Sequence, residues 1–238
     1  MIIYSSLDEE KMQDNLTQKE LKQILSDAFD EDSRNIPREL KRRAMHETCD
    51  FICSNMSFVP FNFKDAKELL TFALKKIGSE GLCLEFGVYT GSSIRDISSI
   101  VKREVFGFDS FEGLPETWRP DFPKGTFKTE KLPMIPKDVI LIKGHFDQTL
   151  PEFTKTHPEP VSFMHIDCDL YSSAKTIFDN FILQITKGTV IVFDEYFNYP
   201  MWKNNEFKAF NEFIEKSNKN FEYLGYVYNH SQVAIRII

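Results

Sequence analysis

Two aspartates close an apolar stretch in the second half of the chain. Residues 161–167 are VSFMHID, and Asp169 follows Asp167 after one intervening residue. Carboxylates are seldom fully buried unless a partner offsets their charge. Residues two apart on a strand project to the same side, so Asp167 and Asp169 would face one pocket if strand geometry continues through Cys168. Such a pair could bind a cation or remove a proton.

A second pair of acids follows a similar apolar stretch. Asp194 and Glu195 lie near the end of the run IVFDEY. If the two runs are strands of one sheet, four acids converge at one edge of it, where ionised carboxylates out of water are costly. Three explanations stay open. A divalent cation with hard oxygen ligands offsets the charge, one carboxyl group is protonated, or some of the acids point into solvent.

Two acids earlier in the chain indicate a different kind of contact. Glu85 stands before Gly87 in a turn that continues to Gly91, and Asp109 follows Glu85 by 24 residues. A carboxylate in this turn would repel phosphate but suits an amino group, and an acid such as Asp109 can bind a ribose diol. Together they suit S-adenosylmethionine (SAM), which carries an amino acid and a nucleoside. Otherwise the turn is a plain strand–helix connection, since the third glycine of a dinucleotide fingerprint is missing.

Alternating strands and helices must position these acids. The patterns predict strands over residues 81–88, 104–109, 138–144, 161–167, 188–196, 221–229 and 231–238, and helices over residues 66–77, 91–103, 150–156, 172–185 and 206–217. This alternation favours an α/β fold with a mostly parallel, seven-stranded sheet covered on both faces. The two final strands add an antiparallel hairpin. Ligands of such sheets bind at the carboxyl ends of the strands, where the acids lie.

A long irregular segment follows the second predicted strand. Residues 110–138 are rich in Pro, Phe and Gly and show no clear periodicity. Loops of this length in compact domains are usually lids or binding loops. We expect Trp118, Phe122 and Phe127 either to cover a ligand or to pack as part of a surface excursion.

The N-terminal part of the chain differs from the rest. Residues 1–60 are polar and mostly helical in pattern, with a capping box from Thr17 to Glu20 and a further helix predicted over residues 38–53. We predict a helical extension over residues 1–60, serving as a lid or as the contact of a homo-oligomer, and a second domain over residues 61–238.

The composition limits the class of partner. The net charge is −7 and no Lys/Arg stripe alternates with aromatic residues, so we expect no nucleic-acid partner. Four cysteines without a CxxC pair favour reduced, structural thiols. The N-terminus lacks a signal-peptide pattern, and no apolar run approaches the length of a membrane span. We therefore expect a cytoplasmic protein without a membrane partner.

Four segments in combination resemble a known family. LEFGVYTGSS, FGFDSFEGLPE, HIDCDLYSS and IVFDEYFNYP have the order and intervals of class I SAM-dependent methyltransferases. More narrowly, the chain resembles the metal-dependent sugar O-methyltransferases of the macrocin and mycinamicin type. The resemblance runs from about residue 80 to the C-terminus and implies a Rossmann-like, doubly wound fold. Its motifs are specific in combination and weak singly.

The resemblance implies a role for each motif residue. SAM would bind Glu85, Gly87, Val88, Tyr89, Gly91, Ser92, Asp109, Ser110, Phe111, Glu112, Gly113, Gly144, His145 and Asp167. Magnesium, or another hard divalent cation, would bind Asp167, Asp194 and Glu195. The sugar enzymes often have Asp at the position of Glu195, whose longer side chain shifts the carboxylate by about one bond. Asp169 would be the catalytic base. The acceptor would contact Tyr171, Tyr196, Tyr199 and Trp202, unless the last aromatic stretch packs in the core.

The predicted reaction is magnesium-dependent methyl transfer from SAM to a hydroxyl of a small polyhydroxylated acceptor, a sugar or sugar nucleotide. A cation lowers the pKa of the acceptor oxygen, and a carboxylate removes its proton. We favour a structural or ligand-contact role for His145 and His165 over metal ligation.

Two other functions stay open. One is O-methylation of a catechol or phenol, which is less favoured because no lysine base lies near Asp167. The other is a SAM-binding partner protein without catalysis, which the full set of four acids disfavours. An NAD-dependent oxidoreductase is disfavoured by the incomplete glycine fingerprint.

Overall fold

The computed structural model describes residues 17–56, 59 and 61–238. The chain divides into two compact units, one ending at Arg43 and the other spanning Ala44–Ile238. Residues 1–16 of the predicted extension lie outside the described residues. The prediction that the N-terminus has no signal peptide falls on these residues. In the described part of the chain, no helix combines the length and the apolar character that crossing a membrane requires.

The first unit holds α1 (Gln18–Ser33) and the beginning of α2 (Ile36–Asn55). The predicted capping box begins α1, since the Thr17 N–H donates to the Glu20 carboxylate (2.8 Å) and the Glu20 N–H donates to Thr17 Oγ1 (3.3 Å). The remainder of α2 belongs to the second unit. The predicted domain boundary at residue 60, and the role of the extension, stay predictions.

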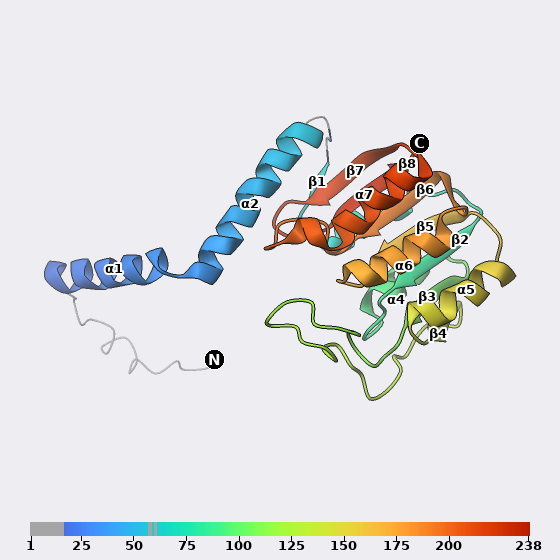
Figure 1. The fold of residues 1–238 in the computed structure, drawn as a ribbon, viewed down its shortest axis with the longest axis horizontal. Coiled ribbons are helices and arrows are strands. Elements are labelled where there is room, and N and C mark those ends of the chain that lie inside the picture. Colours follow the sequence, from blue (N-terminus) through green and yellow to red (C-terminus); the bar gives the residue numbers. More distant parts are fainter. Residues whose placement is uncertain (1–16, 57–58, 60) are drawn as a thin grey trace, which may run out of the picture. The chain divides into compact units, whose positions relative to one another are not determined.

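The second unit is built on an eight-stranded sheet in the order β1-β7-β8-β6-β5-β2-β3-β4 (Figure 1). The strands are β1 (Asn62–Phe63), β2 (Leu82–Phe86), β3 (Val105–Asp109), β4 (Val139–Lys143), β5 (Val161–Ile166), β6 (Ile185–Phe193), β7 (Phe221–Val227) and β8 (Val233–Ile237). Strand β8 pairs antiparallel with β6 and β7, and the other pairs are parallel. The predicted α/β fold with a C-terminal hairpin is confirmed. The short β1 is an eighth strand that the patterns did not predict.

Helices cover both faces of the sheet (Figure 1). They are α3 (Ala66–Leu74), α4 (Ser92–Val101), α5 (Phe146–Thr156), α6 (Tyr171–Phe181) and α7 (Glu206–Ser217), with a short 3-10 helix, η1 (Trp202–Asn204), before α7. Helices α5, α6 and α7 share one apolar cluster with the sheet, and α3 and α4 share a second cluster on its other face. Strands β2 and β5 are buried along their whole length, as the continuous apolar runs of central parallel strands predict.

Backbone hydrogen bonds fix the first residue after four strands of the sheet, β4, β2, β5 and β6. The N–H groups of Gly144, Gly87, Asp167 and Asp194 donate to the carbonyl oxygens of Asp109, Phe108, Phe86 and Ile166, respectively, over 2.9–3.0 Å. The chain runs outward from β2 to β4 and then returns to place β5 beside β2. This return is a topological switch point, which is the usual ligand-binding position in doubly wound sheets.

Candidate active site

A cavity of about 650 Å³ opens where the carboxyl ends of β2 to β6 meet. This volume is within the usual range of small-molecule sites. The predicted site residues that line it are Gly87, Tyr89, Asp109, Ser110, Gly113, Gly144, His145, Asp167, Asp169, Asp194 and Glu195. The sheet therefore brings together most of the predicted donor residues and all four acids of the two predicted pairs.

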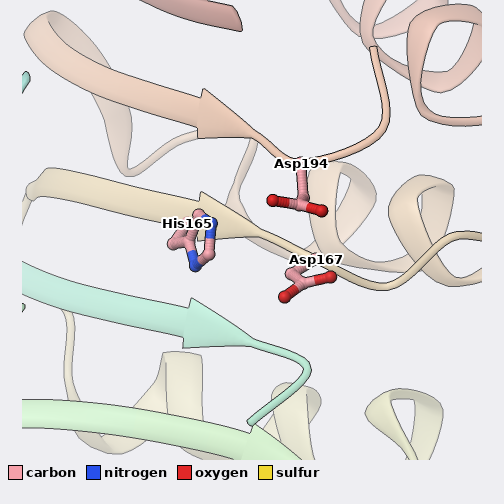
Figure 2. A group of neighbouring side chains, drawn as sticks. All are labelled: His165, Asp167 and Asp194. Carbon is pink, nitrogen blue, oxygen red and sulfur yellow. The ribbon is translucent and has the colours of Figure 1, made fainter. Parts of the chain in front are cut away.

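The four acids share this cavity without an ion pair to a lysine or an arginine of the described chain. Among the described residues, none of Asp167, Asp169, Asp194 and Glu195 forms an ion pair with a lysine or an arginine. Asp167 and Asp194 each place a carboxylate oxygen within 4.8 Å of the other and of a ring nitrogen of His165 (Figure 2). Burial and the charge of Asp194 raise the pKa of Asp167 well above its ordinary value.

His165 is joined to Glu85 beneath the acids. His165 Nδ1 lies 2.8 Å from Glu85 Oε1, and both side chains are buried. Burial alone lowers the pKa of His165, but the hydrogen bond and charge of Glu85, with the charges of Asp167 and Asp194, raise it to about 9. A ring protonated on both nitrogens has no lone pair for a metal. These acids thereby favour the protonated ring of His165 beside Asp167, and the structural or ligand-contact role favoured for it stays a prediction.

The other two acids are also shifted toward the protonated form. Burial and the charge of Asp194 raise the pKa of Asp169 to about 7, although Arg119 opposes the shift. Burial, with the charges of Asp194 and Asp169, raises the pKa of Glu195 to about 8. Glu195 is not part of the close group of Asp167, Asp194 and His165. Direct metal ligation by Glu195 therefore stays a prediction.

A tight turn, rather than a continued strand, presents Asp169 to the cavity. Asp169 has a φ of +61°, and the Leu170 N–H donates to the Cys168 carbonyl oxygen over 2.6 Å. This bond closes a γ-turn centred on Asp169, a conformation that is strained for a residue other than glycine. Strand β5 ends at Ile166, so strand geometry does not continue through Cys168 as the sequence argument for a shared pocket required. Asp167 and Asp169 nevertheless both line the cavity.

Glu206, a residue that the sequence did not single out, joins the loops after β5 and β6. Its Oε1 accepts the N–H groups of Cys168 and Asp169 (3.1 Å each), and its Oε2 accepts that of Glu195 (3.3 Å). The side chain is fully buried, and burial raises its pKa well above the ordinary value. An acid in the first turn of a helix usually stabilises that helix's own N-terminus. No local signal therefore pointed to this contact with other loops.

The segment over residues 110–138 forms part of the cavity wall. Trp118, Phe122 and Phe127 all line the cavity, and the prediction that they cover a ligand stays a prediction. The guanidinium carbon of Arg119 lies 3.9 Å from the centre of the Trp118 ring and 4.5 Å from that of Phe122. Arg119 was not predicted as a site residue, because an isolated arginine in an irregular segment carries no spacing signal.

Asp109 orders the opposite side of the cavity. Its Oδ2 accepts the N–H groups of Val88 (2.9 Å) and Tyr89 (2.7 Å), and its Oδ1 accepts that of Phe111 (2.7 Å). The turns after β2 and β3 are thereby fixed to one another. A carboxylate offers about four acceptor sites, and three of those of Asp109 are used by these N–H groups, so about one remains for a hydroxyl of a bound nucleoside.

Gly87 allows the turn after β2 to contact the backbone of Asp167 after β5. Its φ is +94°, and a Cβ atom built there would lie 1.7 Å from the carbonyl oxygen of Asp167. Only glycine combines this backbone conformation with so close an approach. The contact sets the position of Asp167 relative to the turn after β2.

The remaining predicted residues do not line the cavity. They are Glu85, Val88, Gly91, Ser92, Phe111, Glu112, Tyr171, Tyr196, Tyr199 and Trp202. Tyr196 and Trp202 are buried in the aromatic core, so core packing describes them. The Tyr171 hydroxyl donates to Glu212 on α7 (2.7 Å), and the Tyr199 ring packs 5.8 Å from that of Trp118. Acceptor contacts at these four aromatic positions stay predictions without support from the geometry.

The residues present fit a hard divalent cation. Asp167 and Asp194 offer carboxylate oxygens, the preferred ligands of magnesium and calcium. Gln232, from the turn between β7 and β8, donates from Nε2 to Asp194 Oδ1 (2.9 Å) and so orients that carboxylate. Gln232 was not predicted, because its contact arises only when the hairpin pairs with β6. Asp167 and Asp194 are half-buried and lie side by side, and two carboxylates in such a position are stabilised by an opposite charge nearby.

Residues 84–196 match the family model of a methyltransferase domain. No curated protein matches the chain.

Solved structures similar to this chain include the calicheamicin methyltransferase CalS11, with 20% identity, 93% of each chain covered and a TM-score of 0.58. The apo structure of CalS11, titled a TDP-rhamnose 3'-O-methyltransferase, matches with 18% identity, 93% of this chain and 95% of that chain, and a TM-score of 0.51. The O-methyltransferase NovP matches with 20% identity, 71% of this chain and 78% of that chain, and a TM-score of 0.53. These likenesses confirm the predicted Rossmann-like fold.

Proposed function

We propose that this chain, in which residues 84–196 form a methyltransferase domain, transfers the methyl group of SAM to a hydroxyl group of a small, sugar-like acceptor. The family match confirms the predicted methyltransferase class. The observation that carries the proposed donor and acceptor is the composition of one cavity. The turn that Asp109 orders lies on one side of it, and the four acids lie on the other. Among the described residues, these acids form no ion pair with lysine or arginine.

The donor is proposed to lie along the turns after β2 and β3. Gly87 and Tyr89 line the cavity there, and Asp109 has acceptor capacity left for a ribose hydroxyl. Glu85 does not line the cavity, and its hydrogen bond to His165 gives it a supporting role in this proposal. Gly144 and His145, after β4, extend the same wall toward the nucleoside.

The acceptor is proposed to lie between the acids and the segment over residues 110–138. Carboxylates that lack a basic partner can accept hydrogen bonds from several hydroxyl groups. Trp118 and Phe122 offer aromatic rings beside them, against which a sugar face can pack. The solved neighbour titled a TDP-rhamnose 3'-O-methyltransferase supports a sugar acceptor.

Asp169 is proposed to accept the proton of the acceptor hydroxyl as the methyl group is transferred. It lines the cavity beside Asp167 and Asp194, and the γ-turn holds its backbone in place. Asp167 and Asp194 would hold magnesium, which when bound supplies Lewis acidity and orientation. The SAM sulfonium carries its own leaving group, so the chain's remaining task is to align oxygen, carbon and sulfur.

Calorimetry followed by an acceptor screen tests this proposal. The chain should bind SAM and not NAD, and labelled SAM should transfer its methyl group to a nucleotide sugar or free sugar when magnesium is present. A catechol added to the same screen tests the phenolic alternative. Binding of NAD in place of SAM would overturn the proposal. A homo-oligomer, the lack of nucleic-acid and membrane partners, and a cytoplasmic location stay predictions.

A further inference from the structure

Arg119 is the exception in an acidic cavity. The acids that line the cavity are Asp109, Asp147, Asp167, Asp169, Asp194 and Glu195. Among the described lining residues, Arg119 is the single arginine or lysine. Its guanidinium group is therefore the one permanently charged cation of the wall as far as the structure describes it.

The side chain of Arg119 is held by its neighbours in the 110–138 segment. The Trp118 N–H donates to the Phe122 carbonyl oxygen (3.0 Å), and the Phe122 N–H donates to the Arg119 carbonyl oxygen (2.8 Å). These bonds close a turn that sets the Arg119 backbone. The guanidinium carbon lies 3.9 Å, 4.5 Å and 5.6 Å from the ring centres of Trp118, Phe122 and Tyr199. Stacking on rings leaves the edge of a guanidinium group, which carries its donors, free to bind.

No group of the described chain uses those donors. Arg119 Nε is buried without a hydrogen-bond partner, and Arg119 forms no ion pair among the described residues. Arg236, by contrast, is paired with Glu222. A buried donor left unpaired is destabilising, and Asp169 and Glu195 line the same cavity without closing on Arg119. The geometry indicates a group that is supplied by a ligand.

We propose that Arg119 binds an oxyanion of the acceptor, a phosphate or a carboxylate, so that the preferred substrates are anionic sugar derivatives. A planar guanidinium group matches the two oxygens of such an anion with two parallel hydrogen bonds. This inference rests on the proposed function, since it concerns the acceptor side of the same cavity. The inference adds one requirement to the proposed sugar acceptor. The acceptor must also have a negatively charged group at a set distance from the reacting hydroxyl.

Binding of anionic probes tests the inference apart from catalysis. Uridine diphosphate and glucuronate would each be titrated into the chain by calorimetry at one magnesium concentration, with and without saturating S-adenosylhomocysteine (SAH). The first probe represents phosphate and the second carboxylate. The variants are Arg119→Met and Arg119→Lys. Lys208→Met is the matched control, because Lys208 also stacks on an aromatic ring, Tyr171 at 4.4 Å, but does not line the cavity.

We expect at least one probe to bind the unaltered chain and to bind Arg119→Met about tenfold or more weakly. Arg119→Lys, which keeps the charge but not the paired donors, should lie between the two, and Lys208→Met should match the unaltered chain. SAH affinity should be the same in all four proteins. Equal probe affinity in Arg119→Met, or no binding of either probe to the unaltered chain, overturns the inference.

A third outcome also overturns it. If Arg119→Met weakens SAH, the arginine binds the carboxylate of the donor instead. Failure of the unaltered chain to bind SAH would reject the proposed function, whereas the titrations without SAH still report on Arg119. Thermal unfolding midpoints of the variants show whether each protein is folded.

Discussion

Asp194 and Asp169 line one cavity but have different neighbours, which makes their roles separable by substitution. Asp194 is paired with Asp167 in the close group and is oriented by Gln232. Asp169 lies outside that group, on a γ-turn whose N–H is held by Glu206. A metal ligand and a base should therefore give distinct phenotypes.

Asp194→Ala should remove metal-stimulated methyl transfer by at least about 100-fold, because loss of a direct ligand exceeds the usual effect of outer-shell changes. SAH binding should be nearly unchanged, since the side-chain hydrogen bond of Asp194 goes to Gln232 and not to the turn that Asp109 orders. The measurements are a magnesium titration of activity and calorimetry with SAH. Asp179→Ala, at a surface acid paired with Lys175 and Lys216, is the control. Full activity of Asp194→Ala in the presence of a chelator would rule out the metal site.

Asp169→Asn should lower kcat by about 10²- to 10⁴-fold, the range expected for loss of a general base. The amide keeps the size of the side chain and the γ-turn, so affinity for metal and for SAH should stay close to that of the unaltered chain. Steady-state kinetics and metal titration separate the two effects. Unchanged turnover would remove Asp169 from the role of base.

At the scale of elements, the site depends on contacts that only the assembled fold creates. The acids after β5 and β6 follow apolar runs, so their placement at one edge could be predicted from the sequence. Glu206 comes from the start of α7 and Gln232 from the hairpin turn, and neither has a local pattern that indicates its partner. Arg119 is positioned by ring stacking within an irregular segment. Sequence periodicity identifies strand ends but not the side chains that reach them from elsewhere.

Glu206→Gln should weaken the link between the loops after β5 and β6. Glutamine has one acceptor oxygen and one donor amide, so it must place a donor against an N–H of one loop. We expect a lower kcat with unchanged KM for SAM, and a loss of about 1–3 kcal/mol in the free energy of unfolding. Glu215→Gln, at an exposed position of the same helix, is the control. If Glu206→Gln lowers only the free energy of unfolding and leaves kcat unchanged, Glu206 does not position the acids.

Gly87→Ala should damage the site more than a matched change elsewhere. Gly87 and Gly188 have nearly the same φ (+94° and +96°), but nothing lies within 4 Å of a Cβ added at Gly188. Gly188→Ala should therefore show the effect of backbone strain, about 1–3 kcal/mol. Gly87→Ala should add displacement of Asp167 and loss of SAH binding. Chemical denaturation measures the free energy of unfolding, and calorimetry measures SAH binding. Equal losses of both quantities in the two variants would contradict the proposed close contact at Gly87.

At the scale of the whole molecule, the sheet-containing unit holds every part of the cavity. Its two apolar clusters contain, among the described residues, none before Ala44. The overall α/β arrangement was predictable because alternation of strands and helices is a strong pattern. The short β1 was not, since Asn62–Phe63 is too short to show any periodicity and depends on pairing with β7.

Removal of residues 1–34 tests the predicted role of the N-terminal extension. The truncated chain keeps Asn35, whose side chain accepts the Arg38 N–H (3.0 Å) at the start of α2. Because the cavity and both clusters are retained, we expect the same SAH affinity and a similar thermal midpoint. Sedimentation of the two chains shows whether the removed residues form an oligomer contact. Loss of SAH binding would contradict the expectation that the second unit alone holds the donor site.

The two tryptophans of the chain occupy opposite environments. Trp118 lines the cavity beside Arg119, whereas Trp202 is buried among the rings of Phe51 and Phe207. Indole fluorescence responds to the polarity of its surroundings, so a ligand that enters the cavity changes the emission of Trp118 and leaves that of Trp202 as a constant background. The molecule thus carries its own optical reporter of occupancy, which Trp202→Phe would isolate for stopped-flow measurement of binding rates.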